Sequence, residues 1–116
     1  MINTKRVYDK PAKDDGFRIL VDRLWPRGLT KERAHVDLWM KEIAPSDTLR
    51  KWFHHEEGAW PEFEKRYRAE LKKQAKLLDQ LKSLEKEHRK VTLLFGSKDE
   101  KQNQAVVLAQ ILQGIK

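Results

Sequence analysis

Two kinds of hydrophobic pattern alternate along this chain and predict strands and helices in turn. Short apolar runs at 17–21 (FRILV) and 91–95 (VTLLF) are rich in β-branched and large aliphatic residues, and each is bounded by a glycine, Gly16 before the first and Gly96 after the second. A weaker run at 5–8 (KRVY) is compatible with a first strand, ahead of the turn at 11–16. The pattern therefore predicts strands at 5–8, 17–21 and 91–95.

Helical periodicity marks the middle and the end of the chain. Leu49, Trp52 and Phe53 recur at i, i+3, i+4 behind Ser46, a favourable N-cap residue, so a helix is expected from there to His54–His55. A second helix begins at Pro61 and either continues or restarts until 88–90. Its apolar positions are Trp60, Phe63, Tyr67, Leu71, Leu77, Leu78, Leu81 and Leu84. The last helix is expected at about 101–113, closed by Gly114.

The remaining segments complete an α/β order. Thr30 is a candidate N-cap for a short helix at 30–34, and residues 36–40 fit a short strand or an extended segment equally well. Pro26 excludes both a helix interior and a central strand from the loop at 23–28 (RLWPRG). We expect one compact α/β domain over residues 1–116, with a small, mostly parallel sheet flanked by helices.

The net charge of the chain favours an anionic partner but does not identify its class. The 116 residues carry 25 basic and 18 acidic side chains, a net charge of +7, of which +2 falls in residues 1–58 and +5 in residues 59–116. The excess is concentrated between residues 65 and 90, on predicted helix, where a solvated helical face is the favoured interpretation. A nucleic-acid-binding surface on these Lys-rich helices is the alternative.

Several function classes are excluded or receive no support. The chain has no cysteine, which removes disulfides, thiolate catalysis and Cys-based metal sites. Adjacent histidines such as His54–His55 point about 100° apart on a helix, so no metal site is expected, and no phosphate-cradling glycine motif supports a nucleotide cofactor. We expect no cofactor. The absence of a signal-peptide run and of an apolar span predicts a cytoplasmic protein without membrane contact.

Two loops carry the side chains best suited to chemistry. If the strands at 17–21 and 91–95 are parallel neighbours, the loops at 22–28 and 96–99 meet at their carboxyl ends, where α/β sheets bind ligands. These loops would bring together Asp22, Arg23, Trp25, Arg27, Lys98 and Asp99. Guanidinium forks match anionic oxygens, and an indole can form a flat wall. The alternative is structural: Asp22 and Arg23 pin the loop, Trp25 fills the core and Asp99 caps a helix.

Three further residues could join this set. Arg50 and His54 stand at i, i+4 and share a rim of their helix, and His54 could act as a general acid or base near neutral pH. Lys41 shares a face with Trp39 if residues 36–40 are extended. No third partner for His54 can be named from the sequence.

The succession of motifs resembles a known bacterial family. The strings KRVYD (5–9), DGFRILVDRLWPRG (15–28), DLWMKEIAPS (37–46), LRKWFHH (49–55), YRAEL (67–71) and VTLLFGSKDEKQNQAVVL (91–108) are similar to the YeaO-like proteins of the DUF488 family, over nearly the whole chain. The resemblance implies a small cytoplasmic α/β protein with no established reaction. The matching positions include Asp22, Arg23, Trp25, Arg27, Lys41, Arg50, Asp99 and Asn103.

One departure from the family pattern bears on catalysis. Relatives usually have histidine at the position of Gln104, and a glutamine cannot titrate, although it still donates and accepts hydrogen bonds. A catalytic role for this position is thereby weakened, whereas a binding role survives.

The leading hypothesis is a protein that binds a small anionic or nucleotide-like ligand. Arg23 and Arg27 would hold anionic oxygens, Trp25 would stack, and Asp99 with Asn103 would orient the ligand. Lys41, Arg50 and His54 are weaker candidates for the same ligand site. The sequence points to no reaction and no oligomeric state, so an enzyme remains open. Nucleic-acid binding by the 65–90 helices is the runner-up, and a protein-interaction module around Trp60 and His54–His55 is the third hypothesis.

Overall fold

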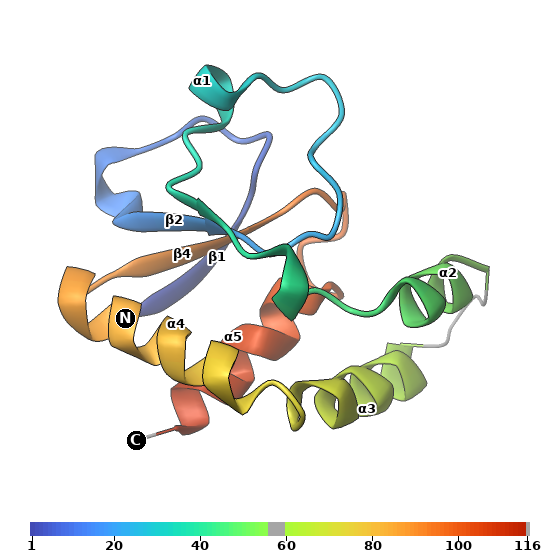
Figure 1. The fold of residues 1–116 in the computed structure, drawn as a ribbon. Coiled ribbons are helices and arrows are strands. Elements are labelled where there is room, and N and C mark those ends of the chain that lie inside the picture. The colour runs from blue at the N-terminus through green and yellow to red at the C-terminus, as the bar shows by residue number, and fades with distance from the viewer. Residues whose placement is uncertain (56–59, 116) are drawn as a thin grey trace.

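A single four-stranded parallel sheet forms the centre of the molecule (Figure 1). The computed structural model describes residues 1–55 and 60–115. The strands are β1 (Ile2–Arg6), β2 (Phe17–Leu20), β3 (Leu38–Trp39) and β4 (Val91–Phe95), arranged in the order β1-β4-β2-β3. All three pairings are parallel. The expected α/β class with a small parallel sheet is confirmed.

The central strand β4 is buried along its whole length because both of its faces are covered. Val91, Leu93 and Phe95 belong to the larger core, whereas Leu94 belongs to a smaller core on the opposite face. Successive side chains of a strand point to opposite faces, so a strand covered on both sides must be apolar at nearly every position. This requirement explains the continuous run VTLLF.

Most of the helices pack on one face of the sheet. They are α2 (Asp47–His55), α3 (Trp60–Leu71), α4 (Ala75–His88) and α5 (Gln104–Gly114). Their apolar positions join those of the strands in the larger core. The opposite face is covered by the short helix α1 (Lys31–Ala34) and its neighbouring loops, where Trp25, Leu29 and Val36 pack on the smaller core. Figure 1 shows α4 and α5 below the strands and α1 above them.

The predicted helix starts depend on capping residues that the structure confirms. The Ser46 hydroxyl accepts a hydrogen bond from the Leu49 N–H (3.1 Å), and the Thr30 hydroxyl accepts one from the Arg33 N–H (3.1 Å). Between Leu71 and Ala75 the chain leaves the helix, so the second long pattern restarts rather than continues.

Some predicted boundaries are wrong. The first strand is Ile2–Arg6 rather than 5–8, because the partner strand β4 aligns with it from Ile2 opposite Val91. Helix α5 begins at Gln104 rather than near residue 101, and Gly114 lies inside its last turn. The undecided segment 36–40 contains the short strand β3, which extends the sheet beside β2.

A buried ion pair, unpredicted from the sequence, fixes the outer face. Arg18 on β2 is only 4% exposed and pairs with Asp15, the last residue of the 3-10 turn η1 (Lys13–Asp15), which also pairs with Lys5. Its Nη2 donates to the Ala34 carbonyl (2.9 Å) and its Nε to the His35 carbonyl (2.9 Å). One side chain therefore ties β2 both to η1 and to the end of α1.

We expect Arg18→Ala to lower the free energy of unfolding by about 2 kcal/mol, because the Ala34 and His35 carbonyls lose their donor and the Asp15 carboxylate keeps only Lys5 and the Ala12 N–H. Urea unfolding would measure the change. The control Arg33→Ala removes an exposed guanidinium from α1 and should cost less than about 0.5 kcal/mol. Equal losses in the two variants would contradict a structural role for the Arg18 pair.

Candidate functional site

A cavity of about 410 Å³ lies where β2 and β4 end side by side. The two strands are parallel neighbours, so the loops that follow them meet at one edge of the sheet, as the sequence predicted. Helix α5 follows the second loop, and the segment before α2 completes the wall. The lining residues are Asp22, Arg23, Leu24, Ala44, Pro45, Arg50, Gly96, Ser97, Lys98 and Gln104.

Asp22 joins the two loops through its carboxylate. The Gly96 N–H donates to Oδ2 at 2.7 Å, and the Gln104 side-chain amide at the start of α5 donates to Oδ1. A Cβ at position 96 would come within 2.8 Å of the Asp22 oxygen, so glycine is needed for this close approach. The carboxylate is thus held by neutral donors from two segments.

The position of Asp22 changes its acidity. Burial raises its pKa from 3.8 to about 6, although the hydrogen bonds from Gly96 and Gln104 act in the opposite direction. Among the described residues, no lysine, arginine or histidine lies within ion-pair distance of this carboxylate. The desolvation of a charge without a cationic partner therefore dominates.

Arg23 is held by backbone carbonyls instead of a carboxylate. Its Nε donates to the Pro45 carbonyl (3.2 Å) and its Nη2 to the Ala44 carbonyl (3.1 Å), just before α2. These contacts order the guanidinium without neutralising it. Arg23 thus contributes a fixed positive charge to the cavity wall.

Arg50 reaches the same cavity from α2. Its Nη2 lies 3.3 Å from the exposed Asp47 carboxylate, a pair that is weakened by solvent. Its Nε is buried and has no hydrogen-bond partner among the described residues. Lys98, an exposed residue of the 96–98 segment, adds a third cation.

Among the described side chains, the predicted site residues Trp25, Arg27 and Lys41 lie outside the cavity lining, as do Asp99 and Asn103. Trp25 donates through Nε1 to the Leu29 carbonyl (2.7 Å) and packs on the smaller core, edge-on to Trp39. The Lys41 ammonium lies over the Trp39 ring, 5.5 Å from its centre. Arg27 is exposed, and its carbonyl accepts a hydrogen bond from a tyrosine hydroxyl. His54 belongs to α2, but its side chain lies outside the described part of the structure.

Asp99 and Asn103 shape the start of α5. The Asp99 carboxylate accepts the N–H groups of Gln102 (3.0 Å) and Lys101 (2.9 Å), which lower its pKa. Asn103 is buried, caps α5 by accepting the Val106 N–H (3.0 Å), and donates to the Asp99 carbonyl. Both therefore set the position of the neighbouring Gln104 rather than face the cavity.

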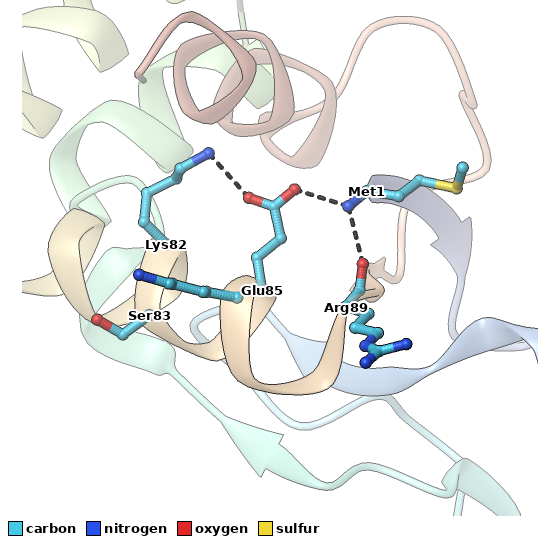
Figure 2. Close-up of a pocket in the computed structure, with 6 residues that line it drawn as sticks. Met1, Lys82, Ser83, Glu85 and Arg89 are labelled. Carbon is cyan, nitrogen blue, oxygen red and sulfur yellow. Dashed lines mark hydrogen bonds and ion pairs between the residues drawn. The ribbon is translucent and has the colours of Figure 1, made fainter.

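A second hollow, of about 610 Å³, lies against α4 among the Lys-rich residues (Figure 2). Figure 2 shows the Glu85 carboxylate between the Lys82 ammonium (2.8 Å) and the Met1 amine (2.8 Å). Lys86 and Arg89 also line this hollow. Two of its cations are thus already paired, which is typical of a solvated helical face; the nucleic-acid alternative stays a prediction.

Other chemistries find no support in the described residues. Within residues 1–55 and 60–115, no cluster of three or more potential ligands could hold a metal ion. Over the same part of the chain, none of the helices has the length and apolarity needed to span a bilayer.

Sequence reasoning missed the partners that hold the site together. The sequence places Gly96 in the loop after a strand and leaves a binding role open for Gln104, but it does not indicate that both contact Asp22. The available signal was the position of Gly96 directly after a buried strand and of Gln104 at the start of the helix that follows it. The carbonyls of Ala44 and Pro45 that hold Arg23 have no such signal, because any residue supplies a carbonyl.

We expect Asp22→Asn to stabilise the protein more at pH 8 than at pH 4. The folded-state pKa of about 6 exceeds the unfolded value of 3.8, so wild type loses stability relative to the neutral variant as pH rises from about 4 to 6. The difference should reach about 1–3 kcal/mol above pH 7. Thermal unfolding of both proteins across this range measures it.

The control for this comparison is Asp79→Asn, on the exposed face of α4. Its difference from wild type should stay nearly constant between pH 5 and 8. An Asp22→Asn difference that is equally flat would show that the Asp22 carboxyl titrates as an exposed group.

Three comparisons place the chain among known proteins. The family model described as the inactive DUF488-N3 subclade matches residues 1–115. The uncharacterized protein YeaO of Escherichia coli is 45% identical over 114 residues, covering 98% of each chain. The uncharacterized protein Rv3073c of Mycobacterium tuberculosis is 39% identical, covering 97% of this chain and 94% of its own. No solved structure gives a significant match.

Proposed function

We propose that this protein, which belongs to the DUF488 family and to its subclade described as inactive, binds a small anionic ligand in the cavity between the loops after β2 and β4. The observation that carries the proposal is the cationic wall of that cavity. Arg23 and Arg50 supply guanidinium groups and Lys98 an ammonium group, against one lining carboxylate, Asp22.

The hydrogen bonding of the two arginines supports a ligand rather than a structural role. A buried guanidinium nitrogen without a partner is costly, and the Nε of Arg50 is one. Arg23 is oriented only by carbonyls, so its charge is not neutralised within the described residues. An oxyanion in the cavity would satisfy both groups, because the planar fork of arginine matches two oxygens at once.

The dimensions of the site favour a small ligand. A volume of about 410 Å³ lies within the range of about 300–1,000 Å³ that is usual for small-molecule pockets. Trp25, the residue expected to stack a base, packs instead on the smaller core. This placement favours a compact anion over a nucleotide held by stacking.

Binding is a better match to these residues than catalysis. Gln104, which contacts Asp22, cannot exchange a proton, and Asp22 is the single carboxylate among the described lining residues. The description of the subclade as inactive agrees with a binding role.

The test is the loss of anion binding in Arg50→Ala. We expect millimolar inorganic phosphate to raise the Tm of wild type, and the variant to bind phosphate about 10–100-fold more weakly, because a charge-assisted hydrogen bond contributes about 1.5–3 kcal/mol. Calorimetric titration gives the two dissociation constants.

The matched control is Arg27→Ala, which removes the same charge from an exposed arginine in the loop after β2, outside the cavity lining. Its phosphate affinity should stay within about twofold of wild type. If both variants bind phosphate equally weakly, the loss reflects net charge and not this cavity. If Arg50→Ala binds phosphate as tightly as wild type, the cavity is not the anion site.

A further inference from the structure

We propose that the cavity selects an oxyanion that carries its own hydroxyl group, such as inorganic phosphate, over a fully ionised one such as sulfate, and that Asp22 makes the distinction. This inference rests on the proposed anion site and names its substrate class. It follows from the presence of an acceptor, and not only donors, in the wall of a cationic cavity.

The Asp22 carboxylate retains capacity to accept further hydrogen bonds. Each of its oxygens receives one donor, from Gly96 and from Gln104, and a carboxylate offers about four lone-pair sites in all. No cation among the described residues takes the remaining sites. A hydroxyl group on the ligand can occupy one of them.

The two neutral donors also fix the direction of the carboxylate. Gly96 has no side chain to displace it, and an added Cβ would collide with Oδ2. Gln104 holds the other oxygen from the first position of α5, whose cap is the buried Asn103. Asp22 is therefore a preorganised acceptor, and an anion bound by Arg23 and Arg50 shares the cavity with it.

Phosphate and sulfate differ in whether the anion carries a hydroxyl group that can donate a hydrogen bond to Asp22. Inorganic phosphate keeps at least one P–OH group across the range in which proteins are stable, whereas sulfate has none. An ionised Asp22 accepts a hydrogen bond from that hydroxyl, but it faces only a negatively charged oxygen of sulfate. Sites that hydrogen-bond a ligand hydroxyl reject the analogue that lacks it by large factors.

The groups around Asp22 define how the selection depends on pH. Arg23 comes from its own loop, Lys98 from the loop after β4, Arg50 from α2, and Gln104 from α5. Burial raises the pKa of Tyr67 on α3, and the nearby charges of Glu70 and then Asp22 raise it further, so it remains a neutral phenol. Asp22 is then the group expected to change charge near pH 6. Below this pH it becomes a donor, and sulfate is accepted.

The experiment compares inorganic phosphate and sulfate by calorimetric titration of the full chain at pH 7.5 and pH 5, in wild type and Asp22→Asn. We expect wild type to prefer phosphate by at least about 100-fold at pH 7.5, and the preference to shrink at pH 5. In Asp22→Asn the amide can donate, so the two anions should bind within about threefold of each other at both pH values.

The outcomes distinguish a failure of the phosphate selection from a failure of the anion site itself. Equal affinity for phosphate and sulfate in wild type, or a preference retained in Asp22→Asn, would overturn the selection but leave the anion site standing. Binding of neither anion by wild type would overturn the proposed function, and the selection with it.

A measurement on wild type alone covers the case in which Asp22→Asn does not fold. Arsenate carries a hydroxyl as phosphate does, whereas perchlorate, like sulfate, carries none. We expect the dissociation constant of arsenate to lie within about tenfold of that of phosphate, and perchlorate to bind as weakly as sulfate. Similar affinities for arsenate and sulfate would contradict the selection.

Discussion

The contact on which this site depends is the bridge from the Asp22 carboxylate to the Gly96 N–H and the Gln104 amide. It joins segments 74 and 82 residues apart in sequence, at the edge where β2 and β4 end together. Parallel pairing brings the two loops to the same edge, and the bridge fixes their separation. The adjacent Arg23 then reaches the carbonyls of Ala44 and Pro45, so that a dipeptide positions three other segments.

Such a bridge has an energetic cost that a purely structural design would avoid. A carboxylate partly removed from water and held by neutral donors destabilises the folded state above its raised pKa. Arg50 adds a buried nitrogen without a partner. Elsewhere in the same fold, the buried Asp15 carboxylate has an oppositely charged partner, Arg18. The Asp22 charge without a cationic partner and the unpartnered Arg50 Nε, both at one cavity among the described residues, are the features on which the proposed ligand rests.

The sequence predicted the elements and the meeting of the two loops, but not the orientation of every side chain. Asp22, Arg23 and Arg50 line the cavity, because each follows or faces the carboxyl end of a buried strand. Trp25 packs on the smaller core instead, since that face of the sheet has no long helix to cover it. Asn103 is used as a cap. Composition and spacing identify a loop, whereas the competition between packing and exposure decides which way its side chains point.

Net charge was a weak guide to the site, and the structure shows why. The basic excess lies in residues 59–116, yet the cations there include several paired with nearby carboxylates, such as Arg66 with Glu62 and Lys82 with Glu85. The guanidinium of Arg23 lies in the nearly balanced half, and its hydrogen-bond partners within residues 1–55 and 60–115 are carbonyls. A carbonyl orders a cation but leaves its charge available, while a carboxylate cancels it. The partner of each cation, more than the number of cations, therefore determines where an anion can bind.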